Sequence, residues 1–213
     1  MEFINVMLHL DKYLNLAIQN YGTLTYLILF LIVFCETGFV FTPFLPGDSL
    51  IFAAGTFAAL GSLNLGLLCL VLSLAAILGD TLNYTIGKFI GKGLFTKKRS
   101  NFIKKEHLEK TQQFYETHGG KTIIIARFMP IIRTFAPFVA GIGEMNYLRF
   151  IAYNIVGGLS WVILLSTLGY QFGNVPIVKE NFTIVIFAII FISILPGIIT
   201  ILNQKLNFKK VDI

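Results

Sequence analysis

The chain has 213 residues, of which 55% are hydrophobic and 13% charged, and its formal net charge is +6. About a quarter of the residues of an ordinary soluble domain are charged, so this composition excludes a typical soluble globular protein. The basic residues lie mainly in two segments, as they do in the cytoplasmic loops of membrane proteins. The positive charge therefore needs no nucleic-acid partner to explain it, and we expect none. Cys35 and Cys69 are single residues inside apolar runs, a pattern that predicts neither a disulfide framework nor a metal site, and we expect no cofactor.

Four stretches of the sequence contain no charged residue and are longer than the about 20 apolar residues that a membrane-spanning helix needs. These stretches are residues 13–35, 49–79, 150–178 and 181–204. We therefore predict an all-α, multi-pass membrane protein with one membrane domain that covers residues 1–213.

Residues 2–20 are predicted to form an amphipathic helix on the membrane surface. Polar side chains recur there at spacings of three and four residues and form one stripe: Asn5, His9, Lys12, Asn15 and Gln19. Residues 24–59 follow as an apolar hairpin that contains Pro43 and Pro46. Because proline lacks a backbone N–H and clashes with the preceding helical turn, we expect a re-entrant segment that turns back inside the membrane. Residues 63–87 then form the first full span.

An internal repeat is indicated by four residue pairs that share one offset of 82 positions. The pairs are Gly61 with Gly143, Asn64 with Asn146, Gly87 with Gly169, and Gly91 with Gly173. Spaced self-similarity of this kind is typical of a repeated structural unit. We predict copies at about residues 1–91 and 102–173, against the alternative that the matches reflect only the low complexity of an apolar sequence.

The second copy is predicted to have the same order of elements as the first. A more charged surface helix at residues 102–118 precedes a second re-entrant hairpin at residues 121–141, which contains Pro130 and Pro137. The second full span follows at residues 145–172.

The basic residues predict the orientation of the chain. Residues 88–121 hold nine Lys or Arg and three Glu, and a tail at residues 204–213 adds Lys205, Lys209 and Lys210 after a last helix at residues 181–203. Because cytoplasmic loops carry an excess of Lys and Arg, we expect both basic segments in the cytoplasm. A single span then separates the two copies, which gives them opposite orientations. Inverted repeats of this kind are typical of secondary transporters, with the binding site near the middle of the membrane.

Five ionisable residues lie inside the apolar segments, where each charge is expensive and calls for a partner or a function. Glu36 and Asp48 belong to the first hairpin, Arg127 and Arg133 to the second, and Asp80 to the first full span. One interpretation is that these acids and arginines only neutralise one another as structural ion pairs.

The alternative interpretation is a binding site. A planar guanidinium matches the oxygens of a phosphate, so Arg127 and Arg133 are the candidate phosphate-binding residues. A carboxylate in a nonpolar cavity has a raised proton affinity, so Glu36 and Asp48 are the candidate proton-coupling residues. Four further residues are candidates for lining the site: Asp80, Tyr84, Asn154 and Trp161.

An ordered set of residues carries a resemblance to a known family over about residues 30–175. The set is Glu36, Phe44-Leu45-Pro46-Gly47-Asp48, Gly79-Asp80, Tyr84, Gly87, residues 127–134, Pro137, Ala140-Gly141, Met145, Phe150, Asn154, Gly157 and Trp161. In these positions the chain resembles the DedA proteins, whose shared region is also called the VTT or SNARE-associated domain. The resemblance implies paired re-entrant loops, two acids and two arginines needed for activity, and dependence on the proton-motive force. Glu36, Asp48, Arg127 and Arg133 occupy the matching positions.

Bacterial DedA proteins are implicated in returning undecaprenyl phosphate to the cytoplasmic face of the membrane, and others in moving phospholipids. The resemblance therefore implies a proton-coupled transporter of a lipid-linked phosphate in the bacterial cytoplasmic membrane. Its expected partners are that lipid, protons or another coupling ion, and a second copy of the chain in a homo-oligomer. A phospholipid flippase or scramblase is the first alternative. A lipid phosphatase is the second, although no histidine falls in the hairpins to activate a nucleophile, and we expect no enzyme.

Overall fold

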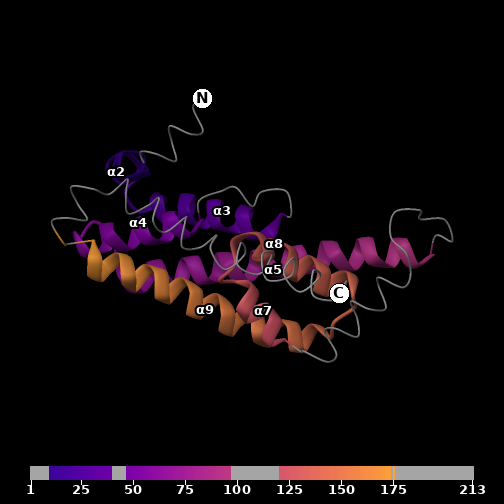
Figure 1. The fold of residues 1–213 in the computed structure, drawn as a ribbon. Helices are drawn as coiled ribbons and strands as arrows, with labels where there is room; N and C mark the ends of the chain where they lie inside the picture. The colour runs from indigo at the N-terminus through magenta and orange to yellow at the C-terminus, as the bar shows by residue number, and fades with distance from the viewer. Residues whose placement is uncertain (1–9, 40–46, 97–119, 174, 176–213) are drawn as a thin grey trace, which may run out of the picture.

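The structure is a computed structural model that describes residues 10–39, 47–96, 120–173 and 175 (Figure 1). The described residues form helices and contain no strand. In chain order the helices are α2 Leu10–Tyr21, α3 Leu24–Gly38, α4 Gly47–Ala59, α5 Leu65–Thr96, α7 Lys121–Ala126, α8 Pro130–Ile142 and α9 Tyr147–Phe172. The predicted all-α fold class is confirmed for these residues. Five predicted elements lie wholly or partly outside them: the start of the first surface helix, residues 40–46 of the first hairpin, the second surface helix, the last helix and the tail.

Two long helices form the frame of the molecule. By length and composition, Leu65–Ile90 of α5 and Tyr147–Phe172 of α9 could each cross a membrane, as predicted for residues 63–87 and 145–172. The α5 helix itself continues beyond this candidate span to Thr96. The apolar pattern stops near residue 87, whereas the backbone stays helical beyond it.

The long helices begin at equivalent asparagine caps. The Asn64 side chain accepts a hydrogen bond from the Leu67 amide at 2.9 Å in the first turn of α5. The Asn146 side chain accepts hydrogen bonds from the amides of Leu148 and Arg149 at 3.0 and 3.2 Å in α9. Because the first amides of a helix have no partner within the helix, a side-chain oxygen at this position fixes where the helix starts. Asn64 and Asn146 are one of the residue pairs that indicate the repeat.

Each long helix is accompanied by a pair of shorter helices. The pair α3 and α4 belongs to the predicted first hairpin, whose prolines at 43 and 46 lie outside the described residues. The pair α7 and α8 belongs to the second, and its break falls at residues 127–129, directly before Pro130 in the first turn of α8. The expectation that Pro137 also breaks the chain was wrong, since Pro137 lies inside α8. Pro137 has no N–H to donate within the helix, and the packing of α8 along α5 keeps α8 continuous at this position.

One short helix of each half packs against the long helix of the other half. α8 of the second half packs mainly against α5 of the first, and α4 of the first half packs mainly against α9 of the second. Gly87 of α5 lies against the carbonyl of Phe138, and Gly169 of α9 lies against the carbonyl of Phe52. These reciprocal close approaches between backbones are what two related halves would make. The boundaries of the repeat stay a prediction, because residues 97–119 are not described.

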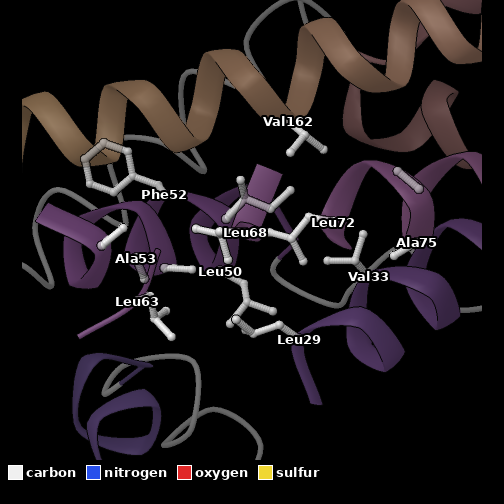
Figure 2. Close-up of a cluster of buried hydrophobic side chains, with 14 of the residues drawn as sticks. Leu29, Val33, Leu50, Phe52, Ala53, Leu63, Leu68, Leu72, Ala75 and Val162 are labelled. Atoms are coloured by element: carbon white, nitrogen blue, oxygen red, sulfur yellow. The ribbon is translucent and has the colours of Figure 1, made fainter. Parts of the chain in front are cut away.

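The main apolar core lies where the first hairpin meets the two long helices (Figure 2). Leu29 and Val33 of α3 and Leu72 of α5 are among its most buried members. The outer faces of α5 and α9 expose many large apolar side chains: Leu67, Leu70, Leu74, Leu78, Leu159, Ile163 and Leu164. A protein that is apolar both inside and outside is suited to a lipid environment.

Candidate functional site

A cluster of charged side chains lies where the short helices meet the long ones. Its acids are Glu36 near the end of α3, Asp48 in the first turn of α4, and Asp80 within α5. Its bases are Arg127, directly after α7, and Arg133 in α8. The fold therefore brings all five of the ionisable residues that the sequence placed at membrane depth into ion pairs.

Arg133 holds both acids of the first hairpin. Its Nη1 donates to Asp48 Oδ1 at 2.7 Å, and its Nη2 donates to Glu36 Oε1. The Gly47 amide, at the start of α4, also donates to Glu36 Oε1 at 3.3 Å. A side chain at Gly47 would overlap the Glu36 carboxylate in its present position, so glycine leaves room for this close approach. One guanidinium thus binds two carboxylates that come from two different helices.

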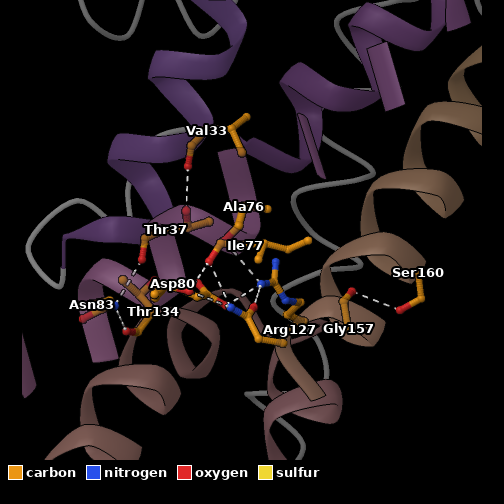
Figure 3. A network of polar contacts seen from close by, with 12 residues as sticks. Val33, Thr37, Ala76, Ile77, Asp80, Asn83, Arg127, Thr134, Gly157 and Ser160 are labelled. Atoms are coloured by element: carbon orange, nitrogen blue, oxygen red, sulfur yellow. Dashed lines mark hydrogen bonds and ion pairs between the residues drawn. The ribbon is translucent and has the colours of Figure 1, made fainter. Parts of the chain in front are cut away.

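Arg127 is held by a separate set of partners (Figure 3). Its Nη2 donates to Asp80 Oδ2 and Asn154 Oδ1, and lies 3.5 Å from the carbonyl of Ala76. The Asn154 Nδ2 donates to the carbonyl of Ile77 at 3.0 Å, which fixes the orientation of this amide. The partners of Arg127 therefore belong to the long helices α5 and α9, and neither acid of the first hairpin pairs with it.

Trp161 of α9 links the two halves of the cluster. Its indole N–H donates to Asp48 Oδ1 at 3.0 Å. The guanidinium carbon of Arg133 lies 4.6 Å from the centre of the indole ring, and that of Arg127 lies 5.9 Å away. Both distances are within the range of a cation–π interaction. The indole therefore contacts the acid that is paired with one arginine and lies against both arginines.

The cluster is closed except near Asp48. Glu36, Asp80, Arg127 and Arg133 are each at most 3% exposed, whereas the Asp48 side chain is 16% exposed. Several buried polar atoms have no hydrogen-bond partner in the described part of the chain: Glu36 Oε2, Asp80 Oδ1, Arg127 Nε and Nη1, and Arg133 Nε. Buried polar groups normally have partners, so these free donors and acceptors indicate a site that can take up a ligand.

The charges of the cluster do not balance. Three carboxylates face two guanidinium groups, which leaves one negative charge in excess when every group is ionised. An uncompensated charge is strongly disfavoured in a nonpolar environment, so the cluster favours the uptake of a cation or a proton.

The candidate lining residues divide into two groups. Asp80, Asn154 and Trp161 contact the arginines, as described above. Tyr84 does not, because its hydroxyl donates to the carbonyl of Met145 and its ring stacks on Phe150 with the ring centres 4.4 Å apart. Tyr84 belongs to a separate apolar cluster between α5, α7, α8 and α9.

Sequence reasoning missed Asn83, which is fully buried three residues after Asp80. Residues three apart lie on the same face of a helix, so the position of Asp80 could have indicated that Asn83 also faces the polar interior.

Apolar outer faces around a buried cluster of charged side chains define the class of this chain: a helical membrane protein with an enclosed polar site. The VTT domain family matches residues 45–171. Protein DedA of Escherichia coli K12 is 52% identical over 204 residues, which cover 95% of this chain and 93% of that protein. Inner membrane protein YqjA of the same organism is 34% identical over 152 residues, with 71% of this chain and 69% of that protein covered.

An uncharacterized membrane protein of Mycobacterium tuberculosis H37Rv is 44% identical over 172 residues, with 80% of this chain and 75% of that protein covered. No solved structure matches the chain. The chain is a membrane protein that belongs to the DedA family.

Proposed function

We propose that this protein carries a lipid-linked phosphate, preferentially undecaprenyl phosphate, across the bacterial cytoplasmic membrane, and that the proton-motive force drives the movement without a covalent step. The observation that carries the proposal is that Arg133 forms ion pairs with both Glu36 and Asp48. The membership of the DedA family supports a transport role in the membrane.

In this proposal the lipid phosphate and the two carboxylates compete for one guanidinium. Arg presents N–H donors in a planar fork that fits a phosphate as well as it fits a carboxylate. The two terminal nitrogens of Arg133 are occupied by Asp48 and Glu36. A phosphate that takes up these two nitrogens would replace the two acids there.

The displaced acids provide the coupling to protons. A carboxylate that loses its guanidinium partner in a nonpolar environment is costly unless it becomes neutral, so Glu36 and Asp48 take up protons as the phosphate enters. A phosphate monoester carries a charge of about −1.5 to −2 near neutral pH. Two protons would offset a dianion and leave the net charge of the cluster unchanged, so we expect about two protons to move with each lipid phosphate.

Two further features support an anion site. α4 begins at Gly47 and α8 at Pro130, and the Arg133 bond to Asp48 brings the first turns of these two helices together. The N-terminus of a helix carries partial positive charge and favours anions. Within the described residues Arg127 Nε and Nη1 have no partner, and Arg127 would be the second phosphate ligand. The apolar tail of the lipid would stay outside, against the exposed apolar side chains of the long helices.

Substituting the acids tests the coupling. Glu36→Gln and Asp48→Asn remove a titratable group, and the amide resembles the protonated acid. In vesicles reconstituted with the purified protein, we expect both variants to bind the lipid phosphate and to lose most of the stimulation of its transport by an imposed pH gradient. Wild-type protein without a gradient is the control. Stimulation equal to that of the wild type in both variants would contradict a role of these acids in proton coupling.

A further inference from the structure

Asn83 joins the backbones of the two helices that carry the central ion pair. Its Nδ2 donates to the carbonyl of Thr37 at 3.1 Å and to the carbonyl of Thr134 at 2.8 Å (Figure 3). Thr37 belongs to α3 and Thr134 to α8, while Asn83 lies between them on α5. Because both partners are carbonyls that only accept hydrogen bonds, the orientation of the amide group is determined.

The two carbonyls belong to the residues that directly follow the ion pair. Thr37 follows Glu36 and Thr134 follows Arg133, so one carboxamide holds the backbone beside the acid and the backbone beside the base. The Thr37 carbonyl is also among the last carbonyls of α3, which have no partner within the helix. Asn83 thus caps α3 and at the same time links it to α8.

The packing around Asn83 shows that this arrangement is tight. Gly79, one turn before Asn83, lies so close to the Thr37 hydroxyl and the Phe34 carbonyl that a side chain there would overlap them. Gly38 lies against Gly79 and Leu82. The Asn83 Oδ1 is buried and has no hydrogen-bond partner in the described part of the chain. An unpaired buried acceptor is costly, which argues that the two donated bonds have a specific role.

We propose that Asn83 is a positioning residue that sets the relative position of Glu36 and Arg133, and thereby the geometry in which a lipid phosphate replaces the carboxylates. This inference rests on the proposed function for its substrate, but the placement of the two helices can be tested without transport. A displacement of about 1 Å at a site of this kind can cost about a hundredfold in rate, so the effect of losing the link is measurable.

Trp161 gives a direct readout of that placement. It is the single tryptophan of the chain, and it contacts Asp48 and the guanidinium of Arg133 but has no hydrogen bond with Asn83. A shift of α8 relative to α3 moves Arg133 against the indole ring and changes the tryptophan emission. A residue that contributed only to overall stability would leave the emission of the folded protein unchanged.

The test uses Asn83→Leu, which keeps the volume and removes both donors, with Ser73→Ala as the matched control. Ser73 is also buried on α5, and its hydroxyl has no hydrogen-bond partner in the described structure. In detergent we expect Asn83→Leu to shift the Trp161 emission of the folded protein, and Ser73→Ala to keep the wild-type spectrum. In vesicles that contain undecaprenyl phosphate, we expect Asn83→Leu to raise the half-saturating lipid concentration about tenfold or more.

Two outcomes would overturn the inference. The first is a wild-type tryptophan emission in Asn83→Leu. The second is an Asn83→Leu protein that has the wild-type half-saturating lipid concentration and differs only in a lower melting temperature. If Asn83→Leu does not fold, Asn83→Gln keeps the amide but displaces it by one methylene group, and the same emission shift is expected. If the wild-type protein moves no lipid phosphate, the proposed function fails, while the emission of the Asn83 variants still decides the role of Asn83.

Discussion

Arg133→Lys is expected to lower the rate of lipid-phosphate translocation about a hundredfold or more while the protein still folds and inserts into membranes. The guanidinium of Arg133 uses two nitrogens to hold two carboxylates from different helices, at 2.7 Å in the case of Asp48. A lysine ammonium supplies one point charge without the planar fork, so it cannot present the same paired donors to a phosphate. The measurement is the translocation of undecaprenyl phosphate in vesicles reconstituted with equal amounts of each purified protein.

Arg149→Lys is the matched control for this substitution. Arg149 is exposed in the first turn of α9, where its backbone amide donates to the Asn146 side chain. We expect this variant to transport like the wild type. If Arg133→Lys also transports at the wild-type rate, Arg133 is only a counter-charge for the acids, and the phosphate site lies elsewhere.

Asp80→Leu is expected to destabilise the protein by about 3–5 kcal/mol, because it leaves the buried guanidinium of Arg127 without its carboxylate. Both side chains of this pair are 1% exposed. The double variant Asp80→Leu with Arg127→Met removes both charges and is expected to recover most of the lost stability. The measurement is thermal unfolding in detergent, compared with Ser73→Ala as a buried control on the same helix.

Transport by the double variant then separates the two roles of Arg127. If Arg127 is the second phosphate ligand, the double variant is stable but carries little lipid phosphate. Wild-type transport by the double variant would show that the Asp80 pair is only structural and that Arg133 alone binds the phosphate. Equal stability of the single and double variants would contradict the ion-pair argument itself.

Much of the frame of the molecule could be predicted from the sequence. The long stretches without charged residues predicted the positions of α5 and α9. The aligned residues Asn64 and Asn146 cap these helices in the structure. The break before Pro130 followed from the chemistry of proline, which cannot continue a preceding helix. Local rules succeed here because helix starts and breaks depend on a few neighbouring residues.

Pairing within the site could not be predicted from the sequence. Charges at membrane depth identified the five ionisable residues, but the sequence does not tell which acid meets which arginine. Arg127 pairs with Asp80 because its side chain reaches α5 from the end of α7, which packs against α9. Arg133 pairs with both Glu36 and Asp48 because α8 packs against α5 of the first half. The role of Asn83 depends on the same arrangement, since its two partners are backbone carbonyls from distant segments.

Simultaneous measurement of lipid and proton movement tests the central claim most directly. Vesicles that contain the purified wild-type protein, undecaprenyl phosphate and an internal pH indicator would report both movements. The account predicts that the lipid phosphate crosses together with about two protons, that phosphatidylethanolamine does not cross at a comparable rate, and that no inorganic phosphate is released. Equal transport of both lipids without proton movement would contradict the account and indicate a scramblase, and release of inorganic phosphate would indicate a phosphatase.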